Sequence, residues 1–384
     1  MNYVRAEKSI YIVQIENIVP SRLYRQATGC MKDQLNEESH EEVRKIQLTG
    51  KSTYIVSLPK RWVVSMNLQP GSQVVIAKQS DASLLLTPKE LFKPAKLGEA
   101  SLAVSQKDDP RTIERKIVAL YLVGYNLIRL HTRNERITAL QRNLVKDLTR
   151  KKLVGTEIIS DSPNEMKLQI LLSYPELSVE SALRRMCLIA ASMHEDTMHA
   201  LKNLNKELCR DIITLDDEVD RFSLYIIRQL KAAVQSERVL KEIGLSSPRD
   251  SLGYRVIGRA VERIADHAVK IAEDIILLDA KIEEPVFERI SELSSFSRSV
   301  FDDSIKSLFK KDYALADSAV AKAKTIVSLE NEALREISKK STDPARLSSI
   351  RIIIESIRRT AEYAGDIAEI VLNLNVNQII ETNP

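Results

Sequence analysis

VRKIQLTGKSTYIVSLPKRWVVSMNLQPGSQVVIAKQSDASLLLTPKE, residues 43–90, decides the fold of the N-terminal part of this chain. Two short runs, Ile46–Leu48 and Tyr54–Leu58, alternate apolar and polar side chains, which is typical of half-buried strands. A short helix is expected after Pro59, and a turn closing at Gly71 precedes two further apolar runs. Four strands of this length cannot bury a core in one chain, so we expect an intertwined homodimer.

The order of these elements resembles that of a known protein family. With LPK at Leu58–Lys60 opening the helix and LQPG at Leu68–Gly71 closing it, the segment resembles the AbrB/MazE/SpoVT swapped-hairpin family. This resemblance implies a DNA-binding head. Many members of that family carry paired arginines a few residues past the helix proline, where this chain has Val63 and Val64. Some AbrB-like modules serve mainly to dimerise, so both roles stay open.

Basic residues concentrate in the same segment, and a dimer would double them. Such a patch neutralises phosphates and releases counterions, which gives affinity for DNA without sequence preference. A guanidinium can pair bidentately with guanine, so the two arginines are the candidates for reading base edges. The alternative is a solvated charged face. The predicted DNA-binding residues are Arg44, Lys45, Lys51, Lys60 and Arg61.

Composition favours a helical, multidomain protein. A chain of 384 residues is too long for one ordinary domain. Only 10 glycines and 5% aromatic residues, with many good helix formers, favour long helices. The net charge of +4 does not by itself demand nucleic acid. No apolar run approaches the length of roughly 20 residues that a membrane span needs, so we expect a cytoplasmic protein without membrane insertion.

Pattern along the chain predicts a multidomain α+β protein. We expect a small swapped-hairpin β domain, a small α+β middle domain, and a mainly α C-terminal half of two three-helix bundles. In the middle domain, helices are expected over 111–123 and 135–150, with strands over 125–131, 156–160 and 166–172. The expected divisions are an N-terminal extension at 1–42, the head at 43–90, a linker at 91–100, the middle domain at 101–175, and bundles at 178–280 and 286–376.

The C-terminal half is helical throughout and looks duplicated. Three helices, a break and three more helices indicate an internal repeat. The helices are longer than solenoid repeats use, so packed bundles are favoured over a superhelix. The expected helices cover 178–208, 215–243, 252–278, 286–309, 312–340 and 345–374.

VERIADHAVKIAED, residues Val261–Asp274, resembles the signature helix of the PhoU family of phosphate-signalling proteins. The resemblance extends over roughly Ser178–Leu374. Together with the head, it is similar to fused regulators of archaea. It implies a DNA-binding, homodimeric regulator of phosphate uptake and homeostasis. The alternative is an adaptor that does not bind DNA and docks on a phosphate transporter or a signalling protein.

Two helices of the first repeat carry acids four residues apart, Asp216 with Asp220 and Glu262 with Asp266. Such pairs share one face of a helix. Facing pairs could supply oxygen ligands to Mg, Mn, Fe or Zn, and in PhoU proteins the corresponding acid pairs bind metal. The alternative is a solvated face on which these acids pair with Arg221, Arg259 and Arg263.

The second repeat departs from this pattern. LENEAL places Leu334 where the first repeat has its last acid, and IRRTAE places Arg358 where the first repeat has Glu262. We therefore expect no metal here, and an ion pair between Arg358 and Glu362 instead. No nucleophilic triad or glycine cradle indicates an enzyme. A metal-dependent phosphohydrolase using the acids of the first repeat is the remaining rival, and it would lose activity on chelation.

Overall fold

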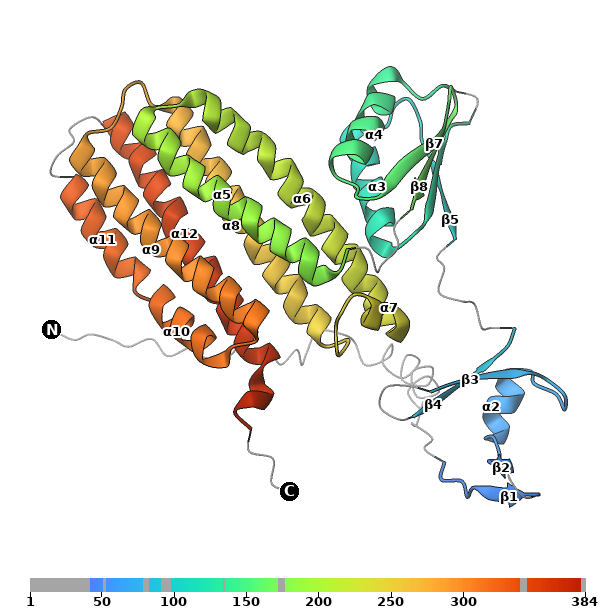
Figure 1. The fold of residues 1–384 in the computed structure, drawn as a ribbon. Helices are drawn as coiled ribbons and strands as arrows, with labels where there is room; N and C mark the ends of the chain where they lie inside the picture. Colours follow the sequence, from blue (N-terminus) through green and yellow to red (C-terminus); the bar gives the residue numbers. More distant parts are fainter. Residues whose placement is uncertain are drawn as a thin grey trace, which may run out of the picture. The chain divides into compact units, whose positions relative to one another are not determined.

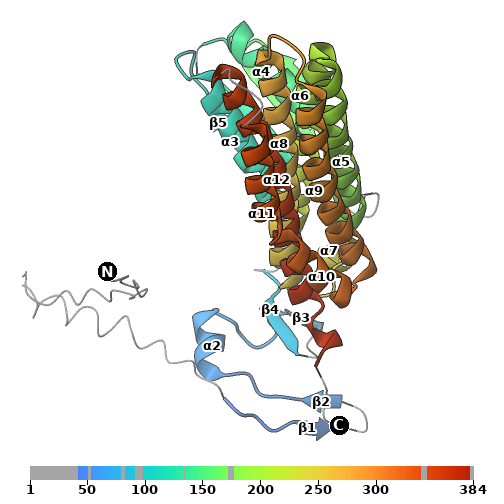
Figure 2. The same ribbon diagram turned by 90° about the vertical axis from the view of Figure 1, so that its left-hand side faces the viewer.

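The protein is described by a computed structural model, shown in two views in Figures 1 and 2. It divides into two compact units, and each is considered by itself. The first unit holds residues up to 77 with 85–92, and the second holds 78–84 with 93–384. The predicted N-terminal extension, apart from Glu42, and Lys51 lie outside the described residues. The structure describes residues 42–50, 53–78, 83–90, 98–133, 135–171, 177–338 and 344–380.

The head contains the predicted elements in the predicted order. Strand β1 (Gln47–Thr49) pairs antiparallel with β2 (Thr53–Ile55), and helix α2 (Lys60–Ser65) follows. Strand β3 (Val74–Lys78) then pairs with β4 (Leu84–Pro88) in a separate two-stranded sheet. Helix α2 begins directly after Pro59, which occupies the N-cap position with a non-helical backbone.

The strands of the head do not bury their apolar side chains within one chain. Leu48 is 59% exposed, Tyr54 74% and Ile76 59%. Exposed apolar strands of this kind need a further partner to form a core. This exposure agrees with the expected pairing of two chains, which stays a prediction.

A four-stranded sheet covered by two helices forms the middle domain. The elements are β5 (Glu99–Ala103), α3 (Pro110–Val123), β6 (Leu127–His131), α4 (Ala139–Lys151), β7 (Thr156–Ser162) and β8 (Glu165–Ile170). The sheet order is β5-β6-β8-β7, with β5 and β6 parallel. The Asp109 side chain accepts from the Thr112 N–H and caps α3, as its place before Pro110 predicts.

One strand of this domain contradicts the sequence prediction. Residues 91–100 were expected to be a linker, but β5 begins at Glu99 and joins the sheet edge beside β6. Its sequence, EASLA, lacks the β-branched and aromatic side chains that mark strands. Pairing with β6 therefore determines its conformation, and local propensity does not.

Long helices make up the rest of the chain. Their bounds are α5 (Val179–Asn203), α6 (Lys206–Gln235), α7 (Glu237–Glu242), α8 (Asp250–Leu277), α9 (Glu284–Lys310), α10 (Tyr313–Ala323), α11 (Ile326–Ile337) and α12 (Pro344–Leu374). The expected break between the first two helices, at 208–215, is wrong. The break lies at Leu204, which has a left-handed backbone, and the Asn205 side chain then caps α6 by accepting from the Leu208 N–H.

A second correction concerns the expected helix 312–340, which is two helices, α10 and α11. Thr325 lies at the break, where its hydroxyl donates to the Lys322 carbonyl over 2.9 Å. The Ser328 hydroxyl donates to the Thr325 carbonyl over 2.7 Å. These side-chain hydrogen bonds offer the backbone an alternative to the helical ladder, which explains the interruption.

The two helical repeats share one hydrophobic core. It runs from Val179 to Val371 without division, and α8 and α12 pack along each other in its centre, as both views show. Ala265 and Ala361 are fully buried, and such small side chains allow helices to approach closely. Among the described residues, no helix combines the length and the apolar character that crossing a bilayer requires.

The middle domain is anchored to the first repeat by Arg228 of α6. This side chain is only 2% exposed. Its guanidinium donates to the Tyr121 carbonyl, to the Gly124 carbonyl over 3.2 Å and to Asn126 Oδ1 over 2.8 Å. A buried guanidinium needs such partners, because an unpaired charge in the interior is costly. The end of α3 is therefore tied to α6.

Candidate functional site

The four acids singled out in the first repeat lie together. Asp216 and Asp220 lie one turn apart on α6, and Glu262 and Asp266 lie one turn apart on α8, the helix that packs against it. Asp216, Asp220 and Glu262 are half-buried, and Asp266 is exposed. We call these four residues the acidic cluster.

Three neighbouring side chains engage the acidic cluster. The Ser223 hydroxyl donates to Glu262 Oε2 over 2.9 Å, and Arg259 forms an ion pair with the same carboxylate. Lys152, which directly follows α4, reaches in from the middle domain, and its Nζ lies 3.3 Å from Asp220 Oδ2. Among the described residues, the buried Oδ1 of Asp216 has no hydrogen-bond partner.

The acids repel one another, and burial adds to the effect. Desolvation, followed by the charges of Asp220, Asp266 and Glu262, raises the pKa of Asp216 to about 7. Desolvation also raises the pKa of Glu262 and Asp266, and nearby Arg259 opposes it. An added cation would favour the charged carboxylates, so the cluster is an electrostatically favourable place for one.

The donor set fits a hard divalent metal in kind. Carboxylate oxygens are the ligands that Mg and Mn prefer, and the buried Asp216 Oδ1 has no hydrogen-bond partner among the described residues. Within the described part of the chain, no three His, Cys, Asp or Glu side chains are already gathered as a metal site. Asp220 and Glu262 are instead paired with Lys152 and Arg259.

The second repeat has a side-chain cation at the corresponding place. Arg358 Nε lies 2.9 Å from Glu330 Oε2, and Arg358 also pairs with Glu362. The predicted ion pair between Arg358 and Glu362 is therefore confirmed. The Arg358 side chain is 16% exposed, so the guanidinium is largely enclosed.

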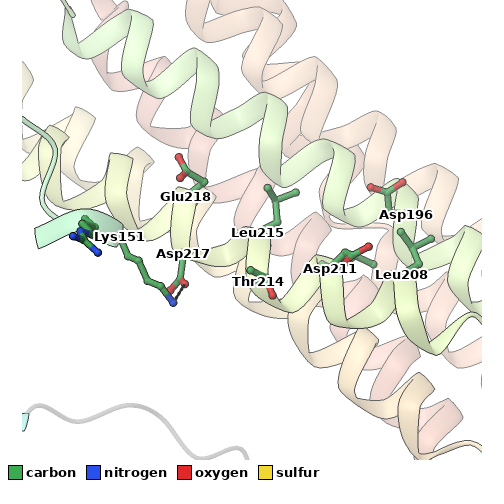
Figure 3. Close-up of a pocket in the computed structure, with 10 residues that line it drawn as sticks. Lys151, Asp196, Leu208, Asp211, Thr214, Leu215, Asp217 and Glu218 are labelled. Atoms are coloured by element: carbon green, nitrogen blue, oxygen red, sulfur yellow. Dashed lines mark ion pairs between the residues drawn. The ribbon is translucent and has the colours of Figure 1, made fainter. Parts of the chain in front are cut away.

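A cavity of about 480 Å³ opens beside the acidic cluster, between the end of α4 and the helices α5 and α6 (Figure 3). Lys151 of α4 and Asp217 lie side by side on its lining, with Nζ 3.8 Å from Oδ2. Acidic side chains outnumber basic ones in the lining, so the cavity favours cations. The charged lining residues are Arg150, Lys151, Asp196, Asp211, Asp217 and Glu218.

The predicted DNA-binding residues that the structure describes are all exposed. Lys60 and Arg61 form the first turn of α2, and Arg44 precedes β1 and pairs with Glu42. Lys45 is exposed beside Arg44. Lys60 and Arg61 therefore occupy one regular element, while Arg44 and Lys45 lie on an irregular segment.

Two histidines lie apart from the acidic cluster. His194 is 2% exposed in the core, and burial lowers its pKa to about 4. His267 follows Asp266 on α8, and its ring centroid lies 5.7 Å from that of Tyr363 on α12. Consecutive helical residues point about 100° apart, so His267 faces the second repeat.

The helices match a known family. The sequence profile of the PhoU domain matches the chain twice, over residues 183–275 and 290–371. The C-terminal half is a pair of PhoU domains. A second profile, for antidote-toxin recognition MazE, bacterial antitoxin, matches residues 47–93. The head is therefore of the MazE/AbrB-like type, as its sequence indicates.

Individual relatives agree with the profile. The "Phosphate-specific transport system accessory protein PhoU homolog" of Aquifex aeolicus is 27% identical over 167 residues, which are 42% of this chain and 71% of the relative. The protein of the same description from Borreliella burgdorferi is 21% identical over 201 residues, 48% of this chain and 85% of the relative.

Two solved structures are also similar to this chain. Crystal structures of PhoU from Streptococcus pneumoniae and Pseudomonas aeruginosa align at 20% and 23% identity, each with a TM-score of 0.46. They cover 53% and 52% of this chain, and 96% of each solved chain.

Sequence reasoning missed two residues of the acidic cluster's surroundings, Lys152 and Ser223. Ser223 lies seven residues after Asp216, two helical turns along the same face of α6, and this spacing could have identified it. Lys152 belongs to another domain, and no local pattern indicates that α4 ends against α6.

Proposed function

We propose that this protein is a PhoU-type regulator of phosphate transport that acts, at least in part, through its head on DNA. The pair of PhoU domains carries the first half of this proposal, since its relatives are described as accessory proteins of a phosphate-specific transport system. The role is regulatory rather than catalytic. The MazE-like head with its exposed cations supports the second half.

DNA contact is assigned to the first turn of α2. A helix N-terminus with two cations suits phosphate oxygens, because its free N–H groups and its dipole favour anions. A second chain, pairing its exposed strands with the first, would present these cations twice. Arg44 and Lys45 extend the same charge along the segment that enters β1.

The test compares full-length wild type with Lys60→Ala/Arg61→Ala by DNA-binding titrations at several salt concentrations. Loss of two phosphate contacts per protomer should weaken binding and reduce the slope of log K against log salt by about 2 per protomer. The matched control, Lys306→Ala/Lys310→Ala, removes the same charge from exposed positions of α9. Unchanged binding by the head variant, or equal losses in both variants, would reject this surface.

The adaptor is the second candidate function, because the exposed apolar strands of the head also suit a purely dimerising module. In that case the PhoU domains dock on a transporter or a signalling protein. The absence of salt-dependent DNA binding by the wild-type protein would favour the adaptor.

The acidic cluster is proposed to bind a divalent or iron cation through Asp216, Asp220, Glu262 and Asp266. Bound there, the cation would supply charge neutralisation between α6 and α8. The chain's own side chains, Ser223 and Arg259, hold Glu262 in place beside it. Cation binding would thereby bias the geometry of the first repeat, and a regulator couples such a change to a second site.

A further inference from the structure

Lys152 is a cation that one domain contributes to the acidic cluster of another. It directly follows α4 of the middle domain, and its Nζ lies 3.3 Å from Asp220 Oδ2 on α6. The preceding residue, Lys151, faces Asp217 with Nζ 3.8 Å from Oδ2. Two successive lysines thus meet two acids of α6, but only Lys152 meets a member of the acidic cluster.

Each repeat has an arginine on the same helix as one of its acids, Arg259 in the first and Arg358 in the second, and the first repeat has Lys152 of the middle domain in addition. In the second repeat Arg358 belongs to the same helix as Glu362, and its side chain is 16% exposed. In the first repeat the Lys152 side chain is 32% exposed and comes from a separate domain, so it can leave.

We propose that Lys152 competes with a divalent metal for the acidic cluster, so that metal binding releases the end of α4 from α6. This inference rests on the proposed metal binding by Asp216, Asp220, Glu262 and Asp266. A metal ligated by Asp220 places two positive charges within a few ångströms of the lysine ammonium. Like charges at that distance repel, and the carboxylate that held Lys152 is neutralised.

Release would be local, because another contact holds the middle domain in place. Arg228 ties the end of α3 to α6 through three acceptors and does not involve the acidic cluster. The domain would pivot about Arg228 while α4 moves. The middle domain directly follows the head in sequence, so this movement gives the metal a route by which to influence the head.

Manganese titration of the full chain tests the competition. Isothermal titration calorimetry with Mn²⁺ compares wild type, Lys152→Met and the control Lys151→Met, which loses the same charge beside Asp217. A partly exposed ion pair is a weak competitor, so Lys152→Met should bind Mn²⁺ about two- to fivefold more tightly than wild type. Lys151→Met should bind less than twofold more tightly than wild type.

Hydrogen exchange provides the second measurement. Added Mn²⁺ should increase exchange of wild-type amides in Ala139–Lys151, and Lys152→Met should show the raised exchange without metal. Equal Mn²⁺ affinities of wild type and Lys152→Met, with exchange in α4 unaffected, would overturn the competition and leave the metal site standing. If neither protein takes up Mn²⁺, the metal site and the competition both fail. Lys152→Gln serves as a second variant if Lys152→Met does not fold.

Discussion

Arg358 Nε lies 2.9 Å from Glu330 Oε2, which joins α12 to α11 at the place where the first repeat has its acidic cluster. The arginine stands where the first repeat has Glu262. The same fold thus holds a carboxylate cluster in one repeat and a carboxylate–guanidinium network in the other. In the first repeat Lys152 of the middle domain reaches the acids, and in the second the arginine lies on the same helix as Glu362.

Replacing Arg358 with Met should destabilise the protein. The change leaves Glu330, 14% exposed, and Glu362, 30% exposed, without their main cation. An enclosed carboxylate that loses its partner keeps its desolvation cost, so we expect a loss of about 2 kcal/mol in the free energy of unfolding. Urea denaturation monitored by circular dichroism measures it.

The neighbouring Arg359→Met is the control for this loss. Arg359 is 42% exposed and pairs with Glu362 Oε2 over 3.1 Å. Exposed pairs contribute little, so about 0.5 kcal/mol or less is expected. Adding Glu330→Leu and Glu362→Met to Arg358→Met should recover most of the stability, and equal losses for both single arginine variants would contradict the account.

The elevated pKa of Asp216 predicts a pH dependence of stability. The unfolded side chain has a pKa near 3.8 and the folded one about 7. Between these values the folded state keeps a proton that the unfolded state has lost, so this group lowers stability as pH rises, with the full cost above pH 7. Asp216→Asn should therefore be more stable than wild type at pH 8, by about 1–2 kcal/mol, and equal to it near pH 4.

The quantity to compare is the difference in stability between Asp216→Asn and wild type, because other groups change the stability with pH in the opposite direction. Burial lowers the pKa of His194 and of His267 to about 4, so the protein loses stability through these histidines as pH falls below about 6.5. Their contribution is the same in both proteins and cancels in the difference between variant and wild type. Asp217→Asn, whose carboxylate faces Lys151 outside the cluster, should show no such pH-dependent gain. Urea melts from pH 4 to pH 8 measure all three proteins.

The sequence predicts those features of the fold and the site that depend on local pattern. The acid pairs on α6 and α8 follow from a spacing of four residues, and the Arg358–Glu362 pair follows from the same rule. Strand β5 and Lys152 could not be predicted, because both depend on partners far away in sequence. The break at Thr325 was missed because a serine or threonine within a helical pattern does not always interrupt it.

The exposed strands of the head predict a dimer. Leu48 and Ile76 lie exposed on β1 and β3, and charged replacements there should prevent two chains from sharing a core. Full-length Leu48→Asp/Ile76→Asp should sediment as a monomer at concentrations where wild type is a dimer. Leu188→Asp, at a 66% exposed position of α5, should keep the wild-type mass. A monomeric wild type would disprove the intertwined head.

Metal content should differ between the two repeats. The first repeat places four acids together, with Asp216 Oδ1 unpartnered among the described residues, while Arg358 fills the corresponding place in the second. Elemental analysis after dialysis against Mg, Mn, Fe or Zn should therefore show loss of metal in Glu262→Ala/Asp266→Ala. Glu330→Ala/Glu362→Ala, which removes the same number of carboxylates, should retain it.

Thermal melts of the same proteins separate a metal site from a merely repulsive face. Acids that repel one another destabilise the metal-free protein, and a bound cation relieves this, so metal should raise the melting temperature of wild type more than that of Glu262→Ala/Asp266→Ala. If wild type carries no metal and the variant melts higher with and without added metal, the four acids are only a mutually repelling face. In that case the cations at the acids of the first repeat are the side chains of Lys152 and Arg259, and no metal joins them.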